Sequence, residues 1–234
     1  MDLPFLQACL NGDRDAGVPH SPEDLAAAAR ACIAAGAKSI HVHPRDVHGD
    51  ETLEPAYVAA AVRALRPLGV ELSFSTGLWI TAHDADARLR LIRGWTEVPD
   101  LVSVNLMEEG WRELADELDR LGIGLEAGVW TPATAALLGE SGLRVRRVLV
   151  EPRSENPYEA VQVAAEIDAA LQDAGVKAPQ LHHGEGPATW AVLDAAVEHG
   201  HEIRIGLEDV TTLPDGRRAP DNAALVVEAV LRYS

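Results

Sequence analysis

Short apolar runs alternate along the chain with longer segments rich in alanine and leucine. The runs are apolar along most of their length, which is typical of parallel strands buried on both faces. They lie at residues 4–10, 38–43, 70–75, 100–106, 122–129, 144–151, 178–183 and 202–208. The helical segments lie at residues 22–35, 55–67, 84–94, 110–121, 132–140, 156–174, 187–199 and 219–232. The pattern therefore predicts strand–helix pairs in succession from one end of the chain to the other.

Local chemistry supports the predicted helices. Before the first of them, Ser21 offers a hydroxyl for the N-cap, and Pro22 suits the first helical position. Gly36 follows the same helix at the point where a glycine would end it. In the segment 156–174, apolar residues recur at the spacing of a helix with one buried face, namely at Ala160, Val163, Ala164, Ile167 and Leu171.

This alternation predicts an α/β fold. Strands that alternate with helices form a parallel sheet with right-handed crossovers, and this many repeats in 234 residues predict a closed sheet. We therefore expect one (β/α)8 TIM barrel over residues 1–234, as a single catalytic domain. The alternative is an open, doubly wound sheet, but neither GxGxxG nor GxxxxGK[ST] follows the first strand.

Composition narrows the partners and the compartment. The formal net charge of −17 argues against nucleic acid or anionic lipid as a partner. The chain start has no basic segment before an apolar run, and no stretch approaches the roughly 20 apolar residues that span a bilayer. We expect a cytoplasmic protein with no membrane partner. Cys9 and Cys32 lack a metal-like spacing, so we expect buried, reduced thiols.

Polar and titratable residues gather at the carboxyl ends of the predicted strands, where a barrel of this kind places its active site. They are His41, His43, Ser75, Thr76, Ser103, Asn105, Glu126, His182, His183, Arg204, Glu208 and Asp209, and Gly77 follows Ser75 and Thr76 at the end of the third strand.

A metal site is the sharpest hypothesis among these residues. His41 and His43 are two apart on one strand, so their imidazoles project to the same side. Glu208 at the end of the last strand is the best third ligand, and two histidines with one carboxylate are typical of catalytic zinc. The alternatives are structural histidines and a surface glutamate paired with Arg217 or Arg218.

Other residues near this set are candidates for catalysis and substrate binding. Asp209 would act as general base, because a metal raises the acidity of a bound substrate. Arg204 would clamp a substrate carboxylate, or else pair with Glu202 or Glu126. Hydrogen bonds to the substrate are expected from Ser75, Thr76, Gly77, Ser103 and Asn105. Glu126 is also expected to bind the substrate. Only one of the adjacent His182 and His183 can face the mouth of the barrel.

The same residues resemble those of the β-keto acid cleavage enzymes, which include the 3-keto-5-aminohexanoate cleavage enzyme. The similarity covers nearly the whole chain in the family's order. It is carried by ACLNG (8–12), SPEDLAAAARACIAAGAKSIHVHPRD (21–46), STG (75–77), SVN (103–105), RIGLED (204–209) and APDNAALV (219–226).

This resemblance implies a (β/α)8 barrel that binds one zinc ion through His41, His43 and Glu208. It implies that Asp209 is the base and that Arg204 assists it. It also implies that Ser75 and Ser103 help to hold a β-keto acid, which reacts with acetyl-CoA to give acetoacetate and a new acyl-CoA by a retro-Claisen route. Many members are homo-oligomers, so we expect the same here.

The chain also departs from the family pattern. Where the aminohexanoate-cleaving members have an acid after the first-strand glycine, it reads Asn11-Gly12-Asp13-Arg14, and Arg14 suits an anion or an uncharged group. We therefore expect 3-keto-5-aminohexanoate not to be the preferred substrate. The Leu78-Trp79 pair and the segment HHGEGPATW (182–190) also differ from better-known members.

Two other functions fit parts of the pattern. Metal-dependent hydrolases of the amidohydrolase type use HxH on the first strand and further histidines on strands 5 and 6, where this chain offers Glu126 and Glu151 instead. A non-catalytic small-molecule binder on the same scaffold is the second alternative.

Overall fold

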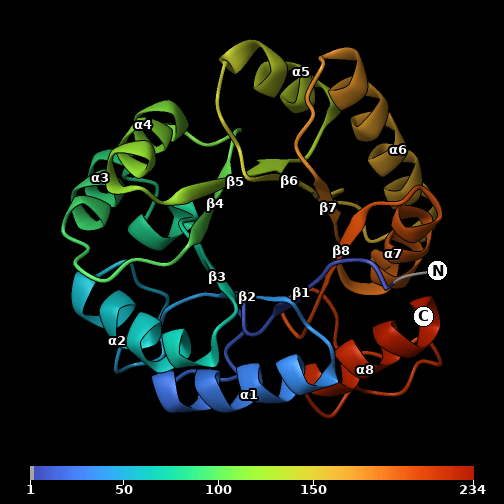
Figure 1. Ribbon diagram of the computed structural model, residues 1–234, viewed down its shortest axis with the longest axis horizontal. Helices are drawn as coiled ribbons and strands as arrows, with labels where there is room; N and C mark the ends of the chain where they lie inside the picture. The colour runs from blue at the N-terminus through green and yellow to red at the C-terminus, as the bar shows by residue number, and fades with distance from the viewer. Residues whose placement is uncertain (1–2) are drawn as a thin grey trace.

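The computed structural model describes residues 3–234, and these form a closed barrel of parallel strands with helices around it (Figure 1). Each strand pairs with the next along the chain, and the first pairs with the last. The strands are β1 (Leu6–Cys9), β2 (Ser39–Val42), β3 (Glu71–Ser75), β4 (Leu101–Asn105), β5 (Gly124–Val129), β6 (Arg147–Val150), β7 (Gln180–His182) and β8 (Glu202–Ile205). The predicted (β/α)8 fold is confirmed.

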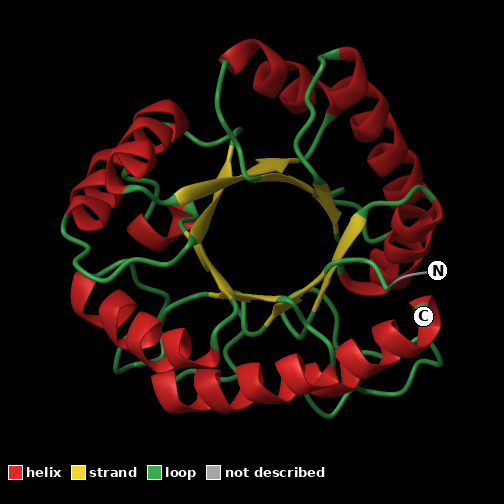
Figure 2. Cartoon of the chain, in the orientation of Figure 1, coloured by secondary structure: helices red, strands yellow, loops and turns green. Residues whose placement is uncertain are grey.

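An outer ring of helices covers the sheet (Figure 2). The helices are α1 (Pro22–Ala35), α2 (Pro55–Leu65), α3 (Ala85–Arg93), α4 (Trp111–Leu121), α5 (Pro132–Ser141), α6 (Pro157–Asp173), α7 (Thr189–Glu198) and α8 (Asn222–Tyr233). Three short 3-10 segments, η1 (Arg66–Leu68), η2 (Leu78–Thr81) and η3 (Gly186–Ala188), lie in the connections. Among residues 3–234, no helix combines the length and apolarity needed to cross a membrane.

The helix ends follow from side chains that the sequence places there. The Ser21 hydroxyl accepts a hydrogen bond from the Asp24 amide, 3.1 Å away, and so caps α1. Gly36 ends that helix with φ of 123°, a conformation that side chains disfavour. The last helix begins later than predicted, at Asn222, because Asp221 is its cap and accepts from the Ala224 amide at 2.8 Å.

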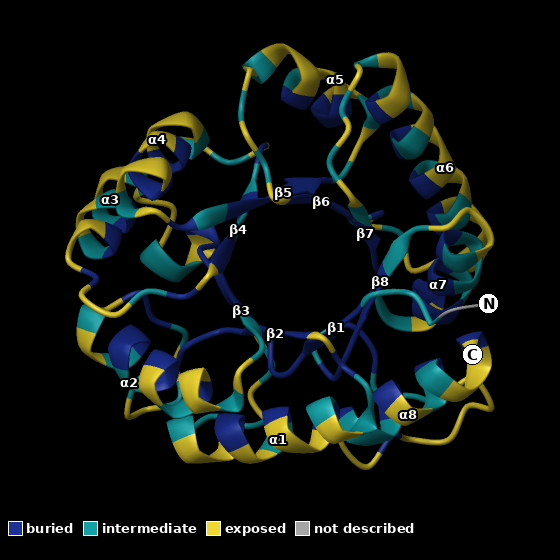
Figure 3. Cartoon of the chain, viewed as in Figure 1, coloured by how far each residue is buried: buried dark blue, intermediate teal, exposed yellow. Residues whose placement is uncertain are grey.

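The core lies between the sheet and the helices, where the inner faces of the helices are buried (Figure 3). Strand residues that point outward to the helices are apolar, as at Leu6, Ala8, Ile40 and Val42. Residues that point to the barrel axis are largely polar, and Gln7 reaches across it to Glu126. This alternation along each strand leaves polar side chains inside the barrel, and the uppermost of them open onto its carboxyl-end mouth.

Candidate metal and active site

A cavity of about 360 Å³ opens at the carboxyl ends of the strands. Strands and loops from all around the barrel line it, so residues distant in sequence share one space. Its walls are Gly12, Asp13, His41, His43, Ser75, Trp79, Ser103, Asn105, Trp130, Leu149, Glu151, Arg153, His183, Gly184, Glu185, Arg204, Glu208 and Asp209.

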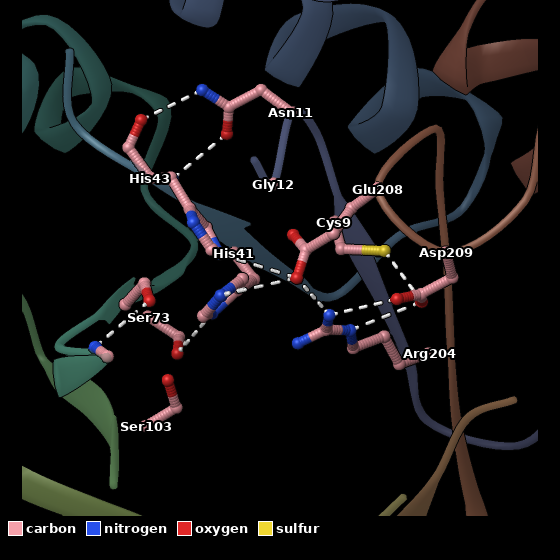
Figure 4. A network of polar contacts seen from close by, with 12 residues as sticks. Cys9, Asn11, Gly12, His41, His43, Ser73, Ser103, Arg204, Glu208 and Asp209 are labelled. Carbon is pink, nitrogen blue, oxygen red and sulfur yellow. Dashed lines mark hydrogen bonds and ion pairs between the residues drawn. The ribbon is translucent and has the colours of Figure 1, made fainter. Parts of the chain in front are cut away.

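His41 and His43 project together from the end of β2, with ring centres 5.3 Å apart (Figure 4). Both imidazoles are buried. The Nδ1 of His41 lies 2.9 Å from the Ser73 hydroxyl, and the Nδ1 of His43 contacts the Glu51 carboxylate. These contacts turn both Nε2 atoms toward Glu208, whose Oε1 is 3.9 Å from that of His41 and 3.3 Å from that of His43.

Glu208 reaches the histidines because the backbone around it is tightly packed. A side chain on Gly206 would meet the Cys9 carbonyl oxygen at 1.8 Å, so only glycine lets β8 approach β1 here. A side chain on Gly12, whose φ is +55°, would meet the Cγ of Glu208 at 2.4 Å. Asn11 fixes the facing loop, since its amide bonds the backbone of His43 through both ends, at 2.8 and 2.9 Å.

The three side chains fit one divalent metal ion. Their ligand atoms lie within 4.8 Å of one another, and the Oε2 of Glu208 is buried without a hydrogen-bond partner. Two imidazole nitrogens with one carboxylate match the donor set of catalytic zinc and leave a coordination position open. Each histidine also uses its second nitrogen on a hydroxyl or carboxylate, as metal-binding histidines commonly do.

Local charge favours a cation at this point. Burial acts to lower the pKa of His43, but the Glu208 and Glu51 carboxylates outweigh it and raise the pKa to about 9. Burial lowers the pKa of His41 well below its usual value, and Arg204 and His43 add to that effect. The carboxylates around His43 therefore favour a positive charge at this point, and a bound cation would supply one.

Asp209 and Arg204 lie beside this set. The guanidinium of Arg204 donates to both Asp209 oxygens, at 3.2 and 2.9 Å, and also to Glu208. The Cys9 thiol donates to Asp209 at 2.9 Å, and His183 Nδ1 lies 3.5 Å from it. Burial acts to raise the pKa of Asp209, but Arg204 and His183 outweigh it and lower the pKa to about 2.

The sequence matches the beta-keto acid cleavage enzyme family over residues 6–178 and 159–232. The chain belongs to this family. The candidate metal ligands and the adjacent aspartate are thus found in a member of a family of beta-keto acid cleavage enzymes. Comparison with curated protein sequences found no significant match.

Solved structures of low sequence identity share the fold. A ternary complex of ObcA with a C4-CoA adduct and oxalate is 17% identical, with a TM-score of 0.71 over 90% of this chain and 62% of that one. A binary complex of ObcA with oxaloacetate gives 17% and 0.70 over the same shares. The chain thus spans about three fifths of the ObcA chains. Thiamine phosphate pyrophosphorylase from Pyrococcus furiosus is 12% identical, with a TM-score of 0.58 over 99% and 96% of the two chains.

Several of the residues that the sequence predicts for the active site line this cavity. Ser75, Ser103 and Asn105 line the wall beside His41. Of the adjacent histidines, His183 faces the cavity, whereas His182 stacks on His201 with ring centres 4.4 Å apart and bonds Gln180. These placements agree with the expectation that one of the two would face the mouth.

Four predicted substrate contacts lie outside the cavity lining. Thr76 donates to the Ser103 carbonyl at 2.6 Å, and Gly77 makes room for the ring of Trp79. Arg14 is in the loop after β1 and does not line the cavity, although Asp13 does. Glu126 is fully buried inside the barrel, below the cavity. Protein donors from Gln7, Ser73 and Arg147 already surround its carboxylate, and its role in substrate contact stays a prediction.

Other members of the site were not identified from the sequence. Cys9 was expected only as a buried thiol, yet it contacts Asp209. The register that pairs it with His41 turns it to the same side as the imidazole, and this register is visible only in the structure. Glu51 approaches His43 from the loop after β2, and the Trp79 indole donates to Glu51 at 2.9 Å. Neither contact has a sequence signal, because each depends on the path of a loop.

Proposed function

We propose that the protein is a zinc-dependent enzyme that exchanges the acyl group of a β-keto acid with acetyl-CoA, giving acetoacetate and a new acyl-CoA. The observation that carries the proposal is the meeting of a His–His–Glu donor set and a second carboxylate at the mouth of the barrel. Family membership supports the cleavage of a β-keto acid. ObcA, with a similar fold and a bound C4-CoA adduct, supports a CoA thioester as the second substrate.

The donor set supports zinc rather than magnesium or calcium, which prefer oxygen ligands. The ion would be held by the Nε2 atoms of His41 and His43 and by the Glu208 carboxylate. When bound, it supplies a Lewis acid that makes the C2 protons of a β-keto acid more acidic. The rest of the cavity then has to bind the substrate carboxylate and move a proton.

Arg204 is placed for both tasks. Its guanidinium lies in the cavity wall and pairs with Asp209, which holds the pKa of Asp209 near 2 and makes it a weak base. A substrate carboxylate that takes over the guanidinium would leave Asp209 with a higher pKa and a stronger pull on a proton. Binding of the correct substrate thus prepares the base. Ser75, Ser103 and Asn105 supply further hydrogen bonds from the facing wall.

The reaction then follows with Asp209 as the only proton carrier. Its carboxylate takes a proton from C2, and the C2 carbanion attacks the acetyl carbonyl of acetyl-CoA. A carbon–carbon bond forms there, and the carbon–sulfur bond breaks to release CoA thiolate. The thiolate attacks the original keto carbonyl, the bond from that carbon to C2 breaks, and C2 recovers the proton from Asp209. The products are acetoacetate and the new acyl-CoA.

A panel of neutral, dicarboxylic and amino-substituted β-keto acids with acetyl-CoA tests the proposal, with acetoacetate as the readout. We expect turnover by zinc-loaded protein, loss of turnover after chelation, and recovery when zinc is restored. Asp209→Asn should keep the metal and lose turnover. Acetoacetate formation that is unaffected by chelation would refute the zinc dependence. Hydrolysis of amides or lactones without CoA would favour the amidohydrolase alternative instead.

A further inference from the structure

A chain of buried polar side chains runs from His41 down into the barrel. The Ser73 hydroxyl lies 2.9 Å from the Nδ1 of His41 and also contacts the Oε2 of Glu126. The other oxygen of Glu126 accepts from the amide of Gln7 at 3.1 Å and from the guanidinium of Arg147 at 3.0 Å. None of the five side chains is more than 2% exposed, so solvent does not compete for these bonds.

The direction of each hydrogen bond in this row of side chains is determined by the pair at its lower end, Arg147 and Glu126. Arg147 carries only donors, and Glu126, paired with it, is an ionised carboxylate that carries only acceptors. The single hydroxyl proton of Ser73 must therefore point at Glu126. The Ser73 oxygen is left as an acceptor toward His41, so the Nδ1 of His41 must carry the proton.

The direction of these hydrogen bonds matters for the metal site. A neutral imidazole with its proton on Nδ1 has a free lone pair on Nε2, and Nε2 is the atom that faces Glu208. The opposite tautomer would point an N–H at the ligand position and could not bind a cation. The Nδ1 of His43 contacts the carboxylate of Glu51 directly, and this contact likewise favours a proton on Nδ1.

We propose that Glu126, acting through Ser73, is a positioning residue that sets the tautomer of His41 for metal binding. The inference rests on the proposed function in that His41 is taken as a metal ligand. It assigns to Glu126 a role that does not involve touching the substrate. It also explains why a carboxylate lies fully buried in the barrel interior next to an arginine.

Glu126→Gln gives the sharpest variant. A glutamine in the same pose would keep its oxygen on the donors of Gln7 and Arg147, which places its NH2 group against Ser73. The Ser73 hydroxyl would then accept from this NH2 group and donate to His41, which reverses the chain and moves the imidazole proton to Nε2. Ser73→Ala breaks the chain without reversing it, so its effect should be smaller.

The test combines a tautomer measurement with a metal titration. In the metal-free protein, 15N NMR of the histidine side chains should find the Nδ1–H tautomer at His41, and the Nε2–H tautomer in Glu126→Gln. Competition with a chromophoric chelator should find zinc affinity lowered about 10–100-fold by Glu126→Gln and less by Ser73→Ala. Ser39→Ala is the matched control, because it removes a buried strand hydroxyl that accepts from Gln7 but contacts neither Ser73 nor a proposed ligand.

An Nε2–H tautomer at His41 in the parent protein would overturn the inference. So would zinc affinity within about twofold of the parent in both variants, since outer partners of real ligands cost more than that. If Glu126→Gln does not fold, Ser73→Ala decides the question by the same titration. Both readouts are independent of turnover, so a protein that behaves as expected here but cleaves no β-keto acid would refute only the proposed function.

Discussion

Replacing Gly12 with alanine tests whether Glu208 is held where the metal needs it. Gly12 has φ of +55°, and its missing side chain is the space that Glu208 occupies. A Cβ there would lie 2.4 Å from the Cγ of Glu208, whereas ordinary contacts begin at 3.4 Å. The carboxylate must therefore move by about 1 Å, and metal ligand distances tolerate only about 0.2 Å.

Two separate costs follow from this substitution. The left-handed backbone costs an alanine about 1–2 kcal/mol, which lowers the melting temperature of a chain of this size by about 2–8 °C. Gly69 is the matched control, because its φ is +71° and nothing lies within 4 Å of its missing side chain. Gly69→Ala should show the stability loss alone, and Gly12→Ala should show it together with a lost metal ligand.

Zinc affinity measured by chelator competition separates the two variants. We expect Gly69→Ala to bind zinc like the parent protein and Gly12→Ala to bind it at least about tenfold more weakly. Thermal unfolding of both metal-free proteins checks that their stability losses are similar. Equal zinc affinity in the two variants would refute the reasoning, because Glu208 would then not need its observed position.

Three further predictions concern other parts of the molecule. Burial, aided by the stacked His201, lowers the pKa of His182 to about 3, so the folded state holds it neutral. The unfolded chain binds the proton first as the pH falls below about 6.5, so stability should fall by about 1 kcal/mol per pH unit between pH 6.5 and 5 relative to His182→Gln. Urea titrations at several pH values that give both proteins the same dependence of stability on pH would contradict this. Cys9→Ala removes a donor from Asp209 and should lower kcat by about tenfold, with zinc content unchanged; steady-state kinetics with metal analysis checks both, and a loss of zinc would contradict it. The value of kcat/KM for 3-keto-5-aminohexanoate should be lower than for neutral or dicarboxylic β-keto acids, and efficient turnover of the amino compound would show that the expectation from the Arg14 segment is wrong.

The fold could be predicted because each segment shows the periodicity of its own structure. The first helix was predicted with its observed bounds, Pro22–Ala35, since both its cap and its final glycine are visible in the sequence. The strands are shorter than predicted. The sixth begins at Arg147 rather than at 144, because Val145 and the two arginines around it lie in the connection and not in the ladder. Apolar character alone does not distinguish a strand from a buried loop.

The meeting of the three candidate metal ligands could be predicted because it depends only on topology. Alternation along β2 brings His41 and His43 to one side, and closure of the barrel brings the end of β8 next to β1. Depth within the barrel is different, because it depends on the stagger between strands. The register pairs Ser73 with His41 and places Glu126 beneath the cavity, and neither placement follows from the sequence pattern.

The most direct test of the metal site is the zinc content of the purified protein after complete chelation and titration with zinc. We predict one tightly bound ion per chain, with histidine nitrogen and carboxylate oxygen ligands in the X-ray absorption spectrum, and loss of that ion in His41→Ala, His43→Ala and Glu208→Gln. Zinc that binds equally well to all three variants, or does not bind to the parent protein, would contradict the account.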